Sequence, residues 1–70
     1  MYIIIEMQTS GGVTAVVTPV VKDTLAEAQQ AFYGTCSYAA VSAVQLHVVL
    51  LLHASGNVID SKAFRHGGDE

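Results

Sequence analysis

The stretch LHVVLLLHASGNVIDSKAF, residues 46–64, decides how this chain folds. It begins with the most hydrophobic run of the sequence, residues 48–52, and a histidine flanks that run on each side. A membrane-spanning helix needs about 20 consecutive apolar residues, so this run is too short for an anchor. The loop ASGN separates the run from VIDSKAF, and this arrangement predicts two antiparallel strands joined by a short turn.

The length of that turn decides which side chains of the two strands face each other. A loop of two or four residues places His53 opposite Val58 and His47 opposite Phe64. An odd loop would move every side chain of one strand to the other face. With an even loop, Leu51 also pairs with Asp60 and Val49 with Lys62, while the other face holds Leu46, Val48, Leu50 and Leu52 against Arg65, Ala63, Ser61 and Ile59.

The first 21 residues predict a second hairpin. Residues 1–10, MYIIIEMQTS, read as a strand, and Gly11-Gly12 suits a two-residue turn because glycine adopts positive φ. The β-branched stretch VTAVVTPVV, residues 13–21, is the expected return strand. Pro19 has no backbone N–H, so we expect this strand to lie at a sheet edge or to end near that residue.

Residues 24–42 predict a helix between the two hairpins. Thr24 and Glu27 have the spacing of a capping box with Thr24 as the N-cap, and we expect the helix to end near Ser42. Gly34 lies inside this helix, where it indicates either close packing or a bend. Apolar residues recur at steps of three or four and form the expected core stripe: Leu25, Ala28, Phe32, Cys36, Ala39 and Ala43.

These elements predict an α+β fold of the type ββαββ in a single domain, residues 1–70. With the strands numbered along the chain, the two most apolar ones, the first and the third, belong in the centre of the sheet. This gives a four-stranded antiparallel sheet in the order 2-1-3-4, with the helix packed on one face. The polar tail, residues 66–70, is expected to fray.

One helix covers only one face of such a sheet. We expect the other face to carry a large mixed apolar patch, which a soluble monomer rarely leaves exposed. A homo-oligomer, dimer or higher, packed through the uncovered face is therefore favoured over a monomer whose charges interrupt the patch. The residues expected on this face are Tyr2, Ile4, Val17, His47, Val49, Leu51 and Phe64, with Glu6, Asp60 and Lys62 among them.

Composition excludes several classes of protein. Three basic and six acidic residues give a net charge of −3 at pH 7, which argues against nucleic acid as a partner. Apolar residues make up half of the chain, which argues against disorder. No basic segment precedes the apolar residues 3–5, so we expect no signal peptide. Cys36 is the only cysteine, which excludes an intrachain disulfide and suits a reducing cytoplasm.

The histidines and Cys36 are the residues most able to do chemistry. His47 and His53 are separated by roughly 20 Å along a strand, so they cannot bind one metal ion, and we expect no metal and no cofactor. His53 is expected at the surface, and Cys36 is expected to pack in the core rather than to act as a nucleophile. The sequence also contains no phosphate-binding loop and no carboxylate pair suited to acid–base catalysis. We therefore expect that the protein is not an enzyme.

Four segments carry a resemblance: MYIIIEMQTS at the start, then EAQQAFY, AAVSAVQLHVVLLL and SGNVIDSKAF. Through them the chain resembles, over nearly its full length, a group of short uncharacterised proteins encoded in prophages and mobile elements of gut Firmicutes. The matching features are Glu27-Ala28, the run from Ala39 to Ser42, His47 and Gly56. The resemblance implies a phage or mobile-element context, and it implies no particular activity.

Two functions are compatible with these observations. In the first, the chain is an oligomer that sequesters a small ligand between subunits, for example a nucleotide-type immune signal of the host. His47, Tyr33, Ser42 and Arg65 are the residues expected to contact it. In the second, the chain is a protein-interaction module, either a phage accessory or structural component or an inhibitor of a host protein, that binds through a sheet edge or an apolar face. A small molecule retained through purification would distinguish the first function from the second.

Overall fold

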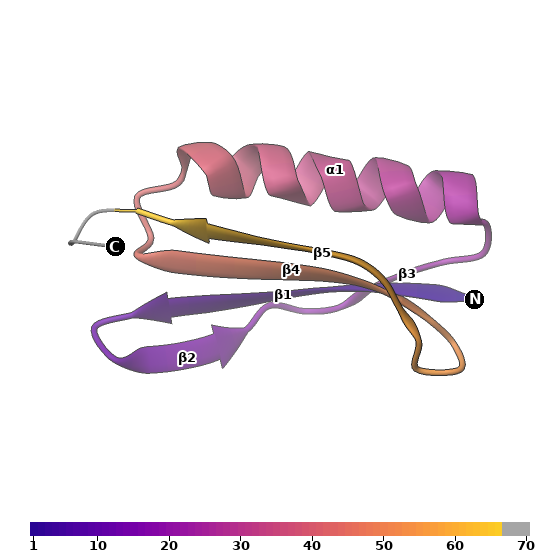
Figure 1. Ribbon diagram of the computed structural model, residues 1–70, viewed down its shortest axis with the longest axis horizontal. Helices are drawn as coiled ribbons and strands as arrows, with labels where there is room; N and C mark the ends of the chain where they lie inside the picture. Colours follow the sequence, from indigo (N-terminus) through magenta and orange to yellow (C-terminus); the bar gives the residue numbers. More distant parts are fainter. Residues whose placement is uncertain (67–70) are drawn as a thin grey trace.

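The computed structural model describes residues 1–66, which fold into one helix and five strands. Figure 1 shows the helix lying along an antiparallel sheet, with the turns of the two hairpins at opposite ends of the molecule. This architecture confirms the expected α+β class. In chain order the elements are β1 (Tyr2–Ser10), β2 (Val13–Val16), β3 (Val20–Lys22), α1 (Leu25–Val41), β4 (Leu46–His53) and β5 (Val58–Arg65).

The sheet has five strands rather than the expected four because the return strand is divided into β2 and β3. Both pair with β1, β2 along its second half and β3 along its first half. Pro19 lies in the interruption, where its missing N–H removes a ladder hydrogen bond, as its position in the sequence predicted. The order is β2-β1-β4-β5 with β3 beside β1, so the two central strands are the expected ones and the broken edge is new.

The turn between β1 and β2 is formed by Gly11 and Gly12. Their φ angles are 60° and 81°, so both lie in the left-handed region that favours glycine. Two successive positive φ values are the signature of the tight hairpin turn that the glycine pair predicted.

The hairpin of β4 and β5 has the register expected for an even loop. The pairing runs from Leu46↔Arg65 through His47↔Phe64 to Leu51↔Asp60. The last pair differs from the prediction, because Leu52 is opposite Val58 rather than Ile59. A β-bulge at this end of the hairpin takes up Ile59 as an extra residue, so Val58, which was expected opposite His53, pairs with Leu52 on the other face of the sheet.

Helix α1 begins and ends where its capping residues predicted. Thr24 is the N-cap, and its Oγ1 accepts a hydrogen bond of 3.2 Å from the backbone N–H of Glu27. The Thr24 hydroxyl in turn donates to Glu27 Oε1 over 3.1 Å, which completes the capping box. Ser42 is the C-cap, and its N–H donates to the carbonyl of Ala39.

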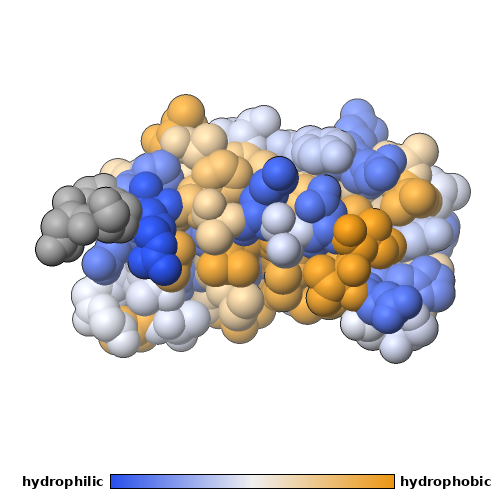
Figure 2. Space-filling view, in the orientation of Figure 1, coloured by the Kyte–Doolittle hydropathy of each residue, from blue (hydrophilic) through white to orange (hydrophobic). Residues whose placement is uncertain are grey.

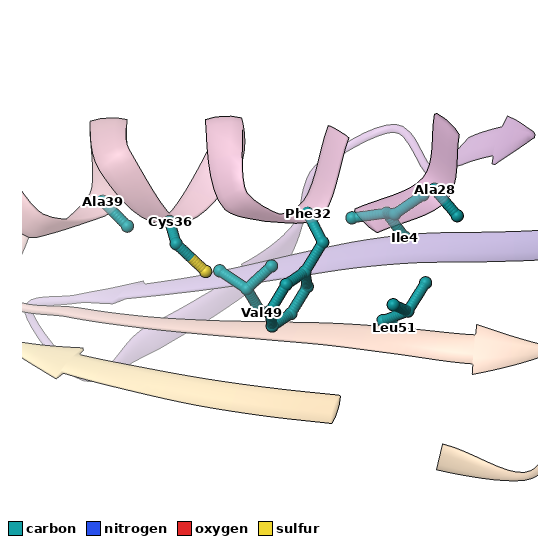
Figure 3. Close-up of a cluster of buried hydrophobic side chains, with 7 residues drawn as sticks. All are labelled: Ile4, Ala28, Phe32, Cys36, Ala39, Val49 and Leu51. Atoms are coloured by element: carbon teal, nitrogen blue, oxygen red, sulfur yellow. The ribbon is translucent and has the colours of Figure 1, made fainter. Parts of the chain in front are cut away.

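The core lies between α1 and the two central strands, as Figure 3 shows. Four residues of the predicted helix stripe are buried, whereas its two end members, Leu25 and Ala43, are exposed. The four buried helix residues pack on the side chains of β1 and β4 that point toward the helix. The complete set of buried apolar residues in the described chain is Ile4, Ala28, Phe32, Cys36, Ala39, Val49 and Leu51.

This core corrects one prediction, because α1 covers the sheet face that was expected to be uncovered. Val49 and Leu51 were expected on the free face, yet they are 0% and 1% exposed beneath the helix. The handedness of the connection from β3 through α1 to β4 explains why the helix covers this face. Strands β3 and β4 both run antiparallel to β1, so they are parallel to each other, and α1 connects them across β1. Such crossovers are right-handed in about 98% of proteins, and the right-handed path places α1 over this face.

Candidate functional site

The sheet face opposite α1 carries mostly apolar side chains, and we call it the open face. Residues 1–66 place no second layer over it. Its centre consists of cross-strand pairs of β1 and β4, such as Ile5↔Leu50 and Met7↔Val48, which are only half-buried. Figure 2 shows, from one side, how apolar side chains gather over the strands. By register, the open face comprises Ile3, Ile5, Met7, Thr9, Thr14, Val16, Val21, Leu46, Val48, Leu50, Leu52, Val58, Ser61, Ala63 and Arg65.

The open face is almost free of charge. Among the strand residues that the structure describes, Arg65 is the only charged one on it, and it lies at the end of the outer strand β5. The other charged strand residues, Glu6, Lys22, Asp60 and Lys62, point to the helix side. A sheet face exposed to water normally alternates polar side chains with the buried apolar ones. The open face therefore has the composition of an interface rather than of a solvated surface.

Both edges of the sheet are poorly suited to accept another strand. On one edge, β2 and β3 are short and the interruption at Pro19 separates them. On the other edge, β5 carries Asp60, Lys62 and Arg65. Short strands, proline and charges are the devices by which proteins prevent edge-to-edge pairing. These features disfavour the addition of a strand at either edge.

A polar pair, the buried His47 and the partly buried Glu6, lies on the opposite face, beneath the helix. His47 is 3% exposed, and its Nδ1–H donates to Glu6 Oε2 over 2.6 Å. Gln8, the next residue of β1 on this face, donates from Nε2 to the same oxygen over 3.3 Å. The pair joins the two central strands diagonally, because His47 is directly opposite Gln8 in the ladder. The carboxylate of Glu6 is partly buried, with 15% of its side chain exposed, and these hydrogen bonds compensate for its lost hydration.

The second nitrogen of the His47 ring, Nε2, is buried and has no hydrogen-bond partner within residues 1–66. The ring of His66 lies nearby, with 6.1 Å between the two ring centroids. His66 is itself engaged, because its Nε2–H donates to the carbonyl of Ala39 in the last turn of α1 over 2.6 Å. Its backbone N–H donates to the backbone carbonyl of Gln45 over 2.7 Å. His66 thus caps the helix end, although fraying was predicted from this residue onward, and residues 67–70 lie outside the described chain.

Cys36 belongs to the core and is poorly suited to nucleophilic chemistry. Burial raises the pKa of its thiol, an effect that Lys62 opposes and that the carboxylates of Asp60 and Glu6 reinforce. A raised pKa keeps the sulfur protonated at neutral pH, whereas a nucleophile must be a thiolate. The environment of Cys36 therefore favours its expected packing role.

The four residues expected to bind a ligand do not meet in one chain. His47 is buried under the helix, whereas Arg65 is on the open face, so the sheet separates them. Tyr33 is 52% exposed on α1. Ser42 caps the helix end, and its Oγ accepts a hydrogen bond of 3.1 Å from the N–H of Val44. A single subunit thus offers no site that uses all four, and only Arg65 lies on the open face.

The helix side of the molecule has a shallow depression that is too small for an ordinary ligand. Its volume is about 190 Å³, and Lys22, Glu27, Gln30 and Ala31 line it. Small-molecule sites usually have volumes of about 300–1,000 Å³. Within residues 1–66 there is also no group of three histidine, cysteine or acidic side chains that could hold a metal ion.

Comparisons with known proteins find no matching family model, no matching curated protein and no matching solved structure. In the described part of the chain, no helix combines the length and the apolar character that a membrane crossing needs.

Sequence reasoning missed the pair of Glu6 and His47. It placed both residues on the same face but expected water or another subunit to cover that face. The signal was present in the strand parity, because an acidic residue in one central strand and a histidine in the other share a face with Ile4 and Leu51. Recognising the pair required the register of β1 against β4, which a hairpin does not fix because these strands are far apart in the sequence.

Proposed function

We propose that this chain is a non-catalytic interaction module whose binding surface is the open face of the sheet. One observation carries the proposal: the open face is broad and apolar, and its single charged strand residue lies at its border. An exposed apolar surface of this extent is typical of a protein-interaction site. The resemblance to prophage and mobile-element proteins supports a role as a phage accessory component or as an inhibitor of a host protein.

The state of the reactive side chains supports a non-catalytic role. Glu6 and His47 bond to each other under the helix, and His66 bonds to the end of α1. The thiol of Cys36 has a raised pKa. A catalytic group must reach a substrate atom, usually directly or through one water molecule. Instead, the Glu6–His47 pair joins β1 to β4, His66 bonds to the end of α1, and Cys36 packs in the core.

Sequestration of a small ligand is a second candidate, and Arg65 is the observation that favours it. Its guanidinium is the only charged group among the strand residues of the open face. Arginine at the border of an apolar interface can bind a phosphate or a carboxylate with two parallel hydrogen bonds. If two copies contribute one arginine each, the anion would lie between subunits, as a nucleotide-type signal would require.

Native mass spectrometry of the protein purified from cells tests both candidates. We compare the wild type with Leu50→Lys, which places a charge in the centre of the open face, and with Tyr38→Lys, a control on the outer side of α1 that is 81% exposed. The proposal predicts that the wild type and the control retain a bound species that Leu50→Lys loses. Circular dichroism establishes that each variant is folded.

The nature of the bound species separates the candidates. A polypeptide supports the interaction module. A small mass that denaturation releases, and that Arg65→Ala abolishes, supports ligand sequestration. A folded wild-type monomer with nothing bound contradicts the proposal as a whole.

A further inference from the structure

We infer that the partner on the open face is a second copy of this chain, packed face to face about a two-fold axis that crosses β1 and β4. The inference rests on the proposed function, because it names the occupant of the same surface. It predicts a four-layer dimer in which two sheets form the middle and one helix covers each outer side.

Charge is the first argument for a second copy. In a two-fold interface the same patch meets itself, so any charge near the centre lies close to a like charge. Among residues 1–66, the central strands place no charged side chain on the open face. Among the acidic residues that the structure describes, Glu6 and Asp60 of the strands lie on the helix side. Two open faces can therefore approach without bringing like charges together at the centre.

The size of the open face is the second argument. Four strands at a spacing of about 4.8 Å and about eight residues at roughly 3.4 Å each give a footprint of roughly 500 Å². The accessible area of a corrugated sheet exceeds its footprint, and the smaller specific interfaces bury about 600 Å² on each partner. The open face is thus large enough for a specific dimer, provided that nearly all of it is used.

The shape of the single chain also favours a second copy. Its Cα radius of gyration is 12.3 Å, whereas a compact domain of this length has a value of about 11 Å. Its dimensions are 37 × 19 × 18 Å, those of a rod. Sheets pack face to face at a distance of about 10 Å, so a second copy stacked on the open face produces a more compact body. It also encloses a second apolar core beside the small one under the helix.

A second copy is also the partner that is present whenever this chain is made. A partner of another sequence would leave the open face exposed whenever this chain is in excess, and exposed patches of this kind promote aggregation. A second copy is always present in equal amount. Because association with the native state adds to stability, self-association also compensates for the marginal stability of a 70-residue chain.

The test measures the mass of the purified protein by light scattering over a dilution series. The wild type is expected at twice the chain mass of 7.4 kDa. Ser61→Lys introduces a charge at an exposed position of the open face, and the matched control Ser37→Lys introduces the same charge at an exposed position of α1. We expect Ser61→Lys to raise the dimer dissociation constant at least tenfold, and we expect Ser37→Lys to leave it unchanged.

Isotope-filtered NMR on a mixture of labelled and unlabelled wild-type chains provides a measurement that needs no variant. The proposed dimer predicts contacts between subunits for the methyl groups of Val48 and Leu50, and none for Val41, which is 83% exposed at the end of α1. Contacts confined to Val41, or a wild type that stays monomeric at every concentration, would overturn the inference. A monomer that still binds another polypeptide through Leu50 would reject the second copy and leave the proposed function intact. A monomer without any partner would reject both.

Discussion

The two faces of the sheet differ in polarity. In a solvated monomer the covered face would be the apolar one and the uncovered face the polar one, but here charged residues lie on the covered face and apolar residues on the uncovered one. The face under α1 is covered, yet it carries four charged strand residues and the buried pair of Glu6 and His47. The open face is uncovered, yet its centre is entirely apolar. Polar groups are kept inside when hydrogen bonds satisfy them, and apolar groups stay outside at a cost. The open face lacks the alternating polar side chains of a solvated sheet surface, which is why we propose a partner for it.

The largest effect on stability is expected from two adjacent leucines of β4 that lie on opposite faces of the sheet. Leu51 is 1% exposed under the helix, and Leu50 is half-buried on the open face. We expect Leu51→Ala to lower the free energy of unfolding by about 2–5 kcal/mol at any protein concentration, because it leaves a cavity in the core. Leu50→Ala should act mainly through association, so its cost should shrink as the protein is diluted. Urea denaturation at several concentrations measures both, and equal costs at high dilution would refute the distinction.

The buried pair provides the next largest effect. We expect Glu6→Ala to lower the free energy of unfolding by about 2–3 kcal/mol, because it leaves Nδ1 of His47 without its charged acceptor. Glu6→Gln retains an acceptor and should cost less. A double-mutant cycle with His47→Leu measures the coupling, which we expect to exceed about 0.5 kcal/mol. Additive costs would show that the bond contributes no stability of its own.

A smaller change, an increase in stability, is expected from a substitution on the outer side of α1, which faces neither the sheet nor the proposed dimer interface. A Cβ added at Gly34 would meet no atom of the described chain within 4 Å, so close packing does not explain this glycine. We expect Gly34→Ala to raise the free energy of unfolding by up to about 1 kcal/mol through higher helix propensity, as measured by thermal unfolding. A loss of stability would indicate that this side of the helix also has a partner.

The smallest expected effect is on chemical reactivity and compares a buried thiol with an open-face thiol. Because burial raises the pKa of Cys36, its alkylation by iodoacetamide at pH 7.5 should be slow and should accelerate as the pH rises. A thiol introduced by Ser61→Cys in a Cys36→Ser chain should react fast in the monomer and more slowly in the dimer. Mass spectrometry over time gives both rates. Fast reaction of Cys36 at pH 7.5 would show that the helix does not seal the core.

The raised thiol pKa also predicts a dependence of stability on pH. The folded chain holds the Cys36 proton more tightly than the unfolded chain, whose thiol titrates near 9.0. This contribution is complete below that value, and stability falls as the pH rises from there toward the higher pKa of the folded state. Denaturation curves above pH 9 should show a loss that Cys36→Ser lacks.

Features that depend on neighbouring residues were predictable. The capping box of Thr24 and Glu27 fixed the start of α1, because both hydrogen bonds close within one helical turn. Gly11-Gly12 predicted its turn because few other residues adopt two positive φ angles in succession. The pairing of β4 with β5 followed from a short loop, with only the bulge near Leu52 unforeseen. Pro19 predicted an interruption near the end of the return strand. It did not predict that β2 and β3 would be two separate strands that both pair with β1.

By itself, the sequence determined the two hairpins, the single helix, the central position of β1 and β4, and the excess of apolar surface. Only the tertiary structure decided which sheet face the helix covers and which face stays open. Both faces of the central strands are apolar enough to form a core, so hydropathy could not choose between them. The choice came from the right-handed path of α1 between the parallel strands β3 and β4. That path buried His47 beside Glu6, 41 positions away in the chain, and left the leucines of the other face without a helix over them.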